Sequence, residues 1–127
     1  MPPKKKILVV DDENALRRAL VDAFNAENLY DLFEASDGEA ALEIIRKEHP
    51  NLVLLDISMP KMDGITLSKK MEKEKLLEKT KIIFLTNSTD MNQIASAMEM
   101  GDADYLIKAD WDMNDIVNRV KEKMATL

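Results

Sequence analysis

Five short strand-like segments alternate with segments of helical period along this chain, and this alternation restricts the fold more than any other feature. We expect strands near residues 6–11, 30–35, 52–56, 81–86 and 103–107. The first, third and fourth are almost continuously apolar, as strands buried on both faces must be, whereas the mixed second strand is predicted to lie at an edge. The pattern predicts an α/β fold in which helices cover both faces of a five-stranded parallel sheet.

Apolar residues at helical spacing between these strands predict five helices. Their apolar faces are Leu16, Leu20, Ala23 and Phe24 in the first, Ala41, Ile44 and Ile45 in the second, Met91, Ile94, Ala95 and Met98 in the fourth, and Met113, Ile116, Val117, Val120 and Met124 in the fifth. The third, over about residues 65–75, is the most charged. Asp37, Asp112 and the turn at Asp63 and Gly64 mark helix starts, because Asp accepts hydrogen bonds from first-turn N–H groups.

Right-handed crossovers leave few strand orders for such a sheet, and we expect the doubly wound order 2-1-3-4-5. Its switch point lies between the first strand, which leads into Asp11 and Asp12, and the third strand, which ends at Asp56. The fourth strand ends at Thr86 and the fifth leads into Lys108. Because the carboxyl ends of parallel strands meet at one edge, these five side chains are predicted to converge on a crevice there.

Length and composition fit one globular domain over residues 1–127, with residues 1–5 as a short solvated tail that includes the first lysines of Lys4 to Lys6. The net charge of -6 argues against nucleic acid as a direct partner. The absence of Cys excludes disulfides and thiol chemistry. Apolar runs are too short for a membrane span or a secretory signal, and we therefore expect a cytoplasmic protein without a membrane partner.

Three carboxylates in one crevice repel one another, by about 4 kcal/mol for a pair ~4 Å apart at an effective dielectric of 20. A bound cation would relieve this repulsion. With no Cys and one His in the chain, oxygen ligands and therefore a hard divalent ion such as Mg²⁺ are favoured. Taken alone, Asp11 and Asp12 would more simply begin a helix, and only their combination with Asp56 and Lys108 favours a site.

A carboxylate can also attack phosphorus and form an aspartyl phosphate, a reaction that depends mainly on positioning and charge neutralisation. Lys108 would offer a positive charge to the phosphoryl group, and Thr86 a hydroxyl donor. One carboxylate must then be the acceptor.

The segments ILVVDDE, LVLLDISMPKMDG, IIFLT and ADYLIKA, taken in this order, resemble the receiver domain of two-component response regulators. The resemblance spans nearly the whole chain, so the chain is similar to the stand-alone, chemotaxis-type regulators of this family. This resemblance implies a flavodoxin-like fold. It implies a role for each candidate residue: Asp56 as phosphoacceptor and metal ligand, Asp11, Asp12 and the backbone carbonyl of Ser58 as further Mg²⁺ ligands, and Thr86 and Lys108 as contacts of the phosphoryl oxygens.

The resemblance also implies partners and a switch. The donor would be a phosphohistidine on a histidine kinase or histidine phosphotransfer protein, and the receiver would catalyse only its own phosphorylation and slow hydrolysis, without acting as an enzyme on other substrates. Thr86 and Tyr105 would switch the surface formed by the fourth helix, fifth strand and fifth helix. We expect a monomer, and whether activation produces a dimer is left open. The sequence does not identify the output partner.

Two positions depart from the family pattern. Ala109 stands where a Pro usually follows the lysine, and we expect a trans bond between Lys108 and Ala109, because a cis bond before a non-proline residue costs about 2.5 to 4 kcal/mol. Asn87 is larger than the usual residue after the threonine and can hydrogen-bond, so it is expected either to narrow access to Asp56 or to contact the phosphoryl group. Ser58 and Ser88, at positions that tune hydrolysis in the family, are small enough to admit water, which predicts a short phosphorylated lifetime.

Two alternatives stay open. A Mg²⁺-dependent phosphatase of the haloacid dehalogenase type also joins an Asp nucleophile to a Thr and a Lys, but that class has a second Asp two residues after the nucleophile, where this chain has Ser58. An inactive scaffolding receiver would not need the acidic pair and Lys108. His49 is expected to end the second helix without a catalytic role, and Trp111 either anchors a partner or packs under its own loop.

Overall fold

The computed structural model describes residues 3–87, 92, 95, 99, 104–108 and 111–127. In it, the strands are β1 (Lys5–Val10), β2 (Tyr30–Ala35), β3 (Leu52–Asp56), β4 (Lys81–Thr86) and β5 (Asp104–Ile107). The α-helices are α1 (Asn14–Glu27), α2 (Gly38–Glu48), α3 (Gly64–Lys73) and α5 (Met113–Ala125), and a 3₁₀ turn spans Leu76–Glu78. The predicted strands agree with these bounds to within one residue at each end.

The five strands form one parallel sheet in the order β2-β1-β3-β4-β5, as predicted. The register brings the predicted site residues together: Val10 pairs with Leu55, so that Asp11 and Asp56 follow side by side. Thr86 pairs with Ile107, and Lys108 comes next. The mixed strand β2 lies at an edge of the sheet, also as predicted.

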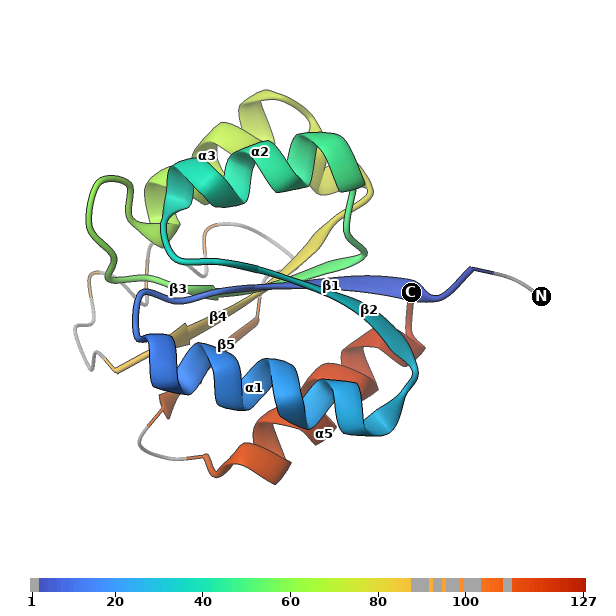
Figure 1. Ribbon diagram of the computed structural model, residues 1–127. Coiled ribbons are helices and arrows are strands. Elements are labelled where there is room, and N and C mark those ends of the chain that lie inside the picture. Colours follow the sequence, from blue (N-terminus) through green and yellow to red (C-terminus); the bar gives the residue numbers. More distant parts are fainter. Residues whose placement is uncertain (1–2, 88–91, 93–94, 96–98, 100–103, 109–110) are drawn as a thin grey trace.

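Helices lie on both faces of the sheet, with α1 and α5 on one face and α2 and α3 on the other (Figure 1). Two apolar cores follow from this arrangement, because successive residues of a strand point to opposite faces. Ile7, Val9 and Leu54 belong to the core under α1 and α5. Leu8 and Val53 belong to the core under α2 and α3. Both faces of β1 and β3 are therefore buried, which explains why their sequences are apolar throughout.

The described residues contain four α-helices, and not the five that the sequence predicts. The fourth expected helix, over residues 91–98, lies mostly outside them. The other predicted helix starts are confirmed: Asp37, Asp63 and Asp112 each occupy an N-cap position and accept a hydrogen bond from a first-turn N–H group. His49 ends α2 in the left-handed conformation, with φ at 47°.

At the amino edge of the sheet, Lys4 and Lys5 are exposed, as expected of a solvated tail, but all three lysines also contact groups within the fold. Lys5 and Lys6 open β1. Each of the three lysines contacts the end of a different helix: Lys4 Nζ donates to Asn28 Oδ1 after α1, Lys5 Nζ to the Met124 carbonyl of α5, and Lys6 Nζ to the Glu48 carbonyl of α2, at 3.0 to 3.2 Å. Lysines favour such positions because the carboxyl end of a helix carries a partial negative charge and free carbonyls.

No helix within the described part of the chain is both long enough and apolar enough to cross a bilayer.

Candidate functional site

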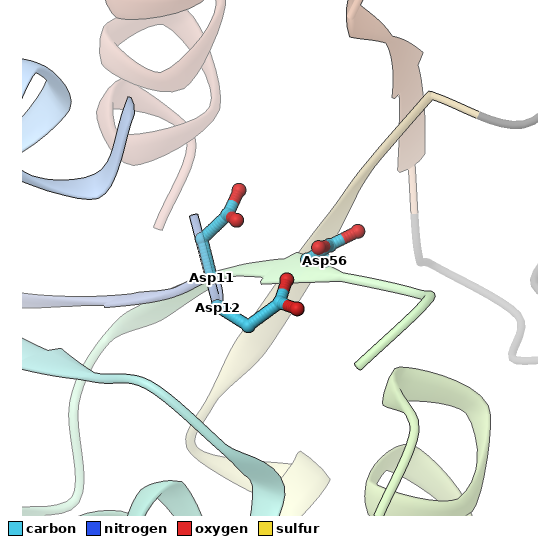
Figure 2. Close-up of side chains that lie close together, drawn as sticks. All are labelled: Asp11, Asp12 and Asp56. Carbon is cyan, nitrogen blue, oxygen red and sulfur yellow. The ribbon is translucent and has the colours of Figure 1, made fainter. Parts of the chain in front are cut away.

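The carboxyl edge of the sheet brings together the side chains that the sequence selected. Asp11 and Asp12 follow β1, Asp56 ends β3, and their carboxylates gather in one place (Figure 2). One oxygen of each lies within 4.8 Å of the others. Asp11 and Asp56 are only 1% and 4% exposed, whereas Asp12 is open to solvent.

The cluster has the chemistry of a hard-metal site. Its three donors are carboxylate oxygens, and Asp11 Oδ2 is a buried atom that accepts no hydrogen bond from any described residue. Its neighbouring positive group is the Lys108 ammonium, at 2.9 Å. The negative charge of the three carboxylates exceeds the positive charge of the one ammonium, and Asp12 is open to solvent. Such a site fits Mg²⁺, which retains several waters and binds through one or two carboxylates. The residues present therefore fit the ion that the sequence predicts.

Asp56 is the carboxyl group whose pKa shifts most among the residues that the structure describes. Burial, and then the nearby charges of Asp11 and Asp12, raise its pKa to about 7, although Lys108 acts in the opposite direction. Its Oδ1 accepts only one hydrogen bond among the described residues, from the Ser58 backbone N–H at 3.3 Å. Functional sites are where such perturbed groups concentrate, because a poorly compensated charge is available to react or to bind.

Lys108 is the positive group of the site, and its side chain is only 8% exposed. Its ammonium lies 2.9 Å from Asp11 Oδ2 and 3.6 Å from Asp56 Oδ2. Burial lowers the pKa of Lys108, but the carboxylates of Asp11, Asp56 and Glu13 outweigh burial and raise it. The lysine therefore stays protonated, and in this structure it pairs more closely with Asp11 than with the predicted acceptor.

The remaining predicted site residues lie where the strand pattern puts them. Thr86 is buried at the end of β4 and Ser58 is exposed two residues after β3. Tyr105 in β5 and Trp111 before α5 are 36% and 37% exposed, so both present part of their ring to solvent. Ser88 and the bond between Lys108 and Ala109 fall outside the residues that the structure describes.

Sequence reasoning missed Glu13. Its Oε1 accepts a hydrogen bond from Asn87 Nδ2 at 3.1 Å and lies 3.4 Å from Lys108 Nζ. The residue directly follows the acidic pair, which is the one signal that could have selected it. Asn87 lies at this crevice too, and its side-chain amide donates to Glu13.

The loop between β3 and α3 is held close to Asp56 by glycine. Gly64 N–H donates to the Ile57 carbonyl at 2.8 Å, and a Cβ on Gly64 would clash with the Asp56 carbonyl oxygen. Gly38 at the start of α2 is similarly close to Met62, with 2.7 Å from a built Cβ to the Met62 carbonyl oxygen. These two close approaches support the loop that follows the acceptor strand.

Comparisons with known proteins agree with this geometry. The model of the response regulator receiver domain matches residues 7–121. The chain is 43% identical over 105 residues to a probable transcriptional regulator of Porphyridium aerugineum, covering 83% of this chain and 42% of the relative. It is 37% identical over 118 residues to sporulation initiation phosphotransferase F of Bacillus subtilis, covering 93% and 92%.

A solved structure shows the same fold. A CheY-like response regulator receiver domain protein from Methanospirillum hungatei superposes with a TM-score of 0.87 at 29% identity, covering 98% of this chain and 96% of that one. The chain thus spans about two fifths of the length of the transcriptional regulator but nearly all of the other two proteins.

Proposed function

This chain belongs to the response regulator receiver domain family, and from that premise we propose that Asp56 accepts a phosphoryl group from a phosphohistidine on a histidine kinase or histidine phosphotransfer protein. One observation carries the proposal: Asp56 is a buried carboxylate with a raised pKa, beside two other carboxylates and an ammonium. A buried charge of this kind is unfavourable unless it has a function or a counter-ion.

The reaction is a displacement at phosphorus. An Asp56 carboxylate oxygen forms a bond to phosphorus, the bond from phosphorus to the donor nitrogen breaks, and the electron pair leaves with the imidazole, which takes up a proton. Lys108 is close enough to pair with an oxygen of the transferred group, because its ammonium already lies 3.6 Å from Asp56 Oδ2. The buried Thr86 hydroxyl at the end of β4 is the proposed donor to another oxygen.

Asp11, Asp12 and Asp56 are the proposed ligands of Mg²⁺, with the Ser58 carbonyl as a fourth. When bound, the ion neutralises the negative charge that accumulates on the carboxylates and the phosphoryl oxygens. The support within this chain is the acidic cluster itself and the buried Asp11 oxygen that accepts no hydrogen bond from the described residues.

Loss of the phosphoryl group is proposed to be intrinsic to the domain. Water attacks phosphorus, the bond to the Asp56 oxygen breaks, and inorganic phosphate leaves. Ser58 is small and exposed, so it leaves room for that water and supports a short lifetime. Ser58 also stands where a haloacid dehalogenase phosphatase would have its acid, and the matches described above are to response regulators. We therefore infer no activity on external phosphate esters.

The surface formed by β5, α5 and residues 91–98 is proposed to bind the output partner. Thr86 and Tyr105 are proposed to change this surface when Asp56 is phosphorylated. The half-exposed Tyr105 and Trp111 on this side support the proposal, because partly exposed aromatic residues favour interfaces. The resting protein is proposed to be a cytoplasmic monomer that acts on another protein. Its net charge of -6 supports the proposal that it does not bind nucleic acid directly.

The test is phosphorylation by acetyl phosphate with Mg²⁺, followed by intact mass. We expect one phosphoryl adduct on the wild-type protein that decays within minutes to an hour, and none with the Asp56→Asn variant or in EDTA. Asp31→Asn, an exposed change on the edge strand β2, is the matched control and should behave as wild type. An adduct that persists in Asp56→Asn would overturn the assignment of the acceptor, and rapid turnover of p-nitrophenyl phosphate would favour the phosphatase.

A further inference from the structure

Glu13 occupies the N-cap position of α1 without capping the helix. Its backbone is extended, with φ at -81° and ψ at 100°, but its side chain makes no capping hydrogen bond. Ser, Thr, Asp and Asn are the residues that cap well at this position, and the longer Glu is a poor choice for it. The carboxylate of Glu13 reaches instead to two residues that are 74 and 95 positions away in the chain.

Those two residues are Asn87 and Lys108, and both belong to the ends of other strands. Asn87 directly follows Thr86 on β4, and Lys108 follows β5. A single atom, Glu13 Oε1, accepts from Asn87 Nδ2 at 3.1 Å and lies 3.4 Å from Lys108 Nζ. The carboxylate therefore bridges the β1 side of the crevice to the β4 and β5 side.

The three carboxylate partners of Lys108 differ in how easily they can leave. An ammonium has three N–H donors, and Asp11, Asp56 and Glu13 lie around it. Asp11 and Asp56 are buried, and separating a buried pair leaves an uncompensated charge. The Glu13 side chain is 52% exposed, so water can replace the ammonium as its partner.

We propose that Glu13 is a positioning residue that holds Lys108 and Asn87 in the resting arrangement and is the partner that Lys108 releases when a phosphoryl group arrives. This inference rests on the proposed function of Asp56. An incoming phosphoryl oxygen needs a donor on Lys108, and the exposed carboxylate competes for it. Departure of Glu13 frees that donor and also frees Asn87 Nδ2, so the bridge slows phosphoryl uptake in the resting protein.

Two variants separate the bridge from the helix cap. Glu13→Gln keeps the length of the side chain and removes its charge. Glu13→Asp keeps the charge, is one methylene too short for the bridge, and is a good N-cap residue. Both are expected to increase the rate of phosphorylation by acetyl phosphate about fivefold, the factor that corresponds to ~1 kcal/mol for an exposed ion pair. Glu39→Gln, an exposed change in the first turn of α2, is the matched control and should leave the rate unchanged.

A purely structural role would give a different set of results. Under the proposal, Glu13→Asp phosphorylates faster while its midpoint of urea unfolding is unchanged or higher. The ratio of the Glu13→Gln rate to the wild-type rate falls toward one as salt is raised, because salt screens the ion pair. Asn87→Ala increases the rate less than Glu13→Gln, and the double variant is no faster than Glu13→Gln alone.

The proposal is overturned if Glu13→Gln phosphorylates at the wild-type rate or more slowly while remaining folded, or if Glu13→Asp is simply less stable and slower. The same preparation reports on the proposed function by itself. An adduct that Asp56→Asn abolishes, together with no effect of Glu13→Gln, would leave Asp56 as the acceptor and remove only the role of Glu13.

Discussion

The two edges of the parallel sheet treat charge in opposite ways. At the amino edge, Lys4, Lys5 and Lys6 each contact a polar group at the end of a helix, and the Lys6 ammonium also pairs with the Glu48 carboxylate at 3.1 Å. At the carboxyl edge, the carboxylates of Asp11, Glu13 and Asp56 lie 2.9 to 3.6 Å from the single ammonium of Lys108, so negative groups outnumber the positive one.

The backbone at the amino edge is equally well paired. Asn51 joins three segments, because its Oδ1 accepts from Lys6 N–H, its own N–H donates to the Lys6 carbonyl and its carbonyl accepts from Lys81 N–H. The buried Thr80 hydroxyl donates to the Pro50 carbonyl at 2.6 Å. The two edges of the sheet therefore have different roles. The amino edge, where polar groups are paired, stabilises the fold, and the carboxyl edge, where carboxylates are in excess, can bind and react.

The largest expected effect tests whether the carboxyl edge really destabilises the protein. Asp56→Asn should raise the free energy of unfolding by about 2 to 4 kcal/mol at pH 8 in EDTA, since a pKa raised from 3.8 to about 7 corresponds to that order of energy. Urea denaturation measures it, with Asp31→Asn as the exposed control. An unchanged or lower stability of Asp56→Asn at pH 8 would contradict the comparison.

The pH dependence of this effect has a definite sign. The folded state binds a proton on Asp56 more tightly than the unfolded state does, because its folded pKa is raised. The corresponding stability is present below about pH 4 and is lost as the pH rises to about 7. The advantage of Asp56→Asn over wild type should therefore shrink by more than half between pH 8 and pH 5.

A smaller effect of opposite sign is expected at the amino edge. Thr80→Val preserves the shape of the side chain but leaves the Pro50 carbonyl without its 2.6 Å hydrogen bond, which should lower the free energy of unfolding by about 1 to 3 kcal/mol. Thr66→Val on the exposed face of α3 is the control. Phosphorylation by acetyl phosphate should be unaffected by Thr80→Val, and a large change in that rate would mean that the two edges are coupled.

The smallest effect concerns the lysines. Lys6→Met removes contacts with the Glu48 carbonyl and carboxylate at the end of α2, and should lower the free energy of unfolding by about 0.3 to 1 kcal/mol at low salt. Lys69→Met, on an exposed position in α3, is the matched control. The difference between the two variants should vanish near 1 M NaCl. If it persists, packing of the lysine stem, and not charge, explains the contribution.

Much of the fold was predictable because it depends on local pattern. The apolar runs in β1, β3 and β4 require burial on both faces, which only a parallel sheet between two helix layers provides. Asp37, Asp63 and Asp112 cap helices through hydrogen bonds that span three residues, so short-range sequence is sufficient to identify them. The meeting of Asp11 and Asp56 follows from the same topology.

The contacts that the sequence did not predict are those in which a side chain acts over a long chain separation. A run of lysines at the start of a chain is typically solvated, and nothing local indicates that the ends of three helices lie beside it. In the sequence, Glu13 resembles one more acidic residue at the start of a helix. Its contacts with Asn87 and Lys108 depend on how the ends of β4 and β5 lie relative to β1. Such contacts require the register of several strands at once.

By itself, the sequence determined that Asp11, Asp12, Asp56, Thr86 and Lys108 share one edge of a doubly wound sheet, because the periods of strands and helices allow few other arrangements. Only the tertiary structure decided which partner Lys108 prefers, which residue bridges it to Asn87, and how the lysines at the opposite edge are paired. These depend on differences of a few tenths of an ångström between side chains from distant segments, which local pattern does not encode.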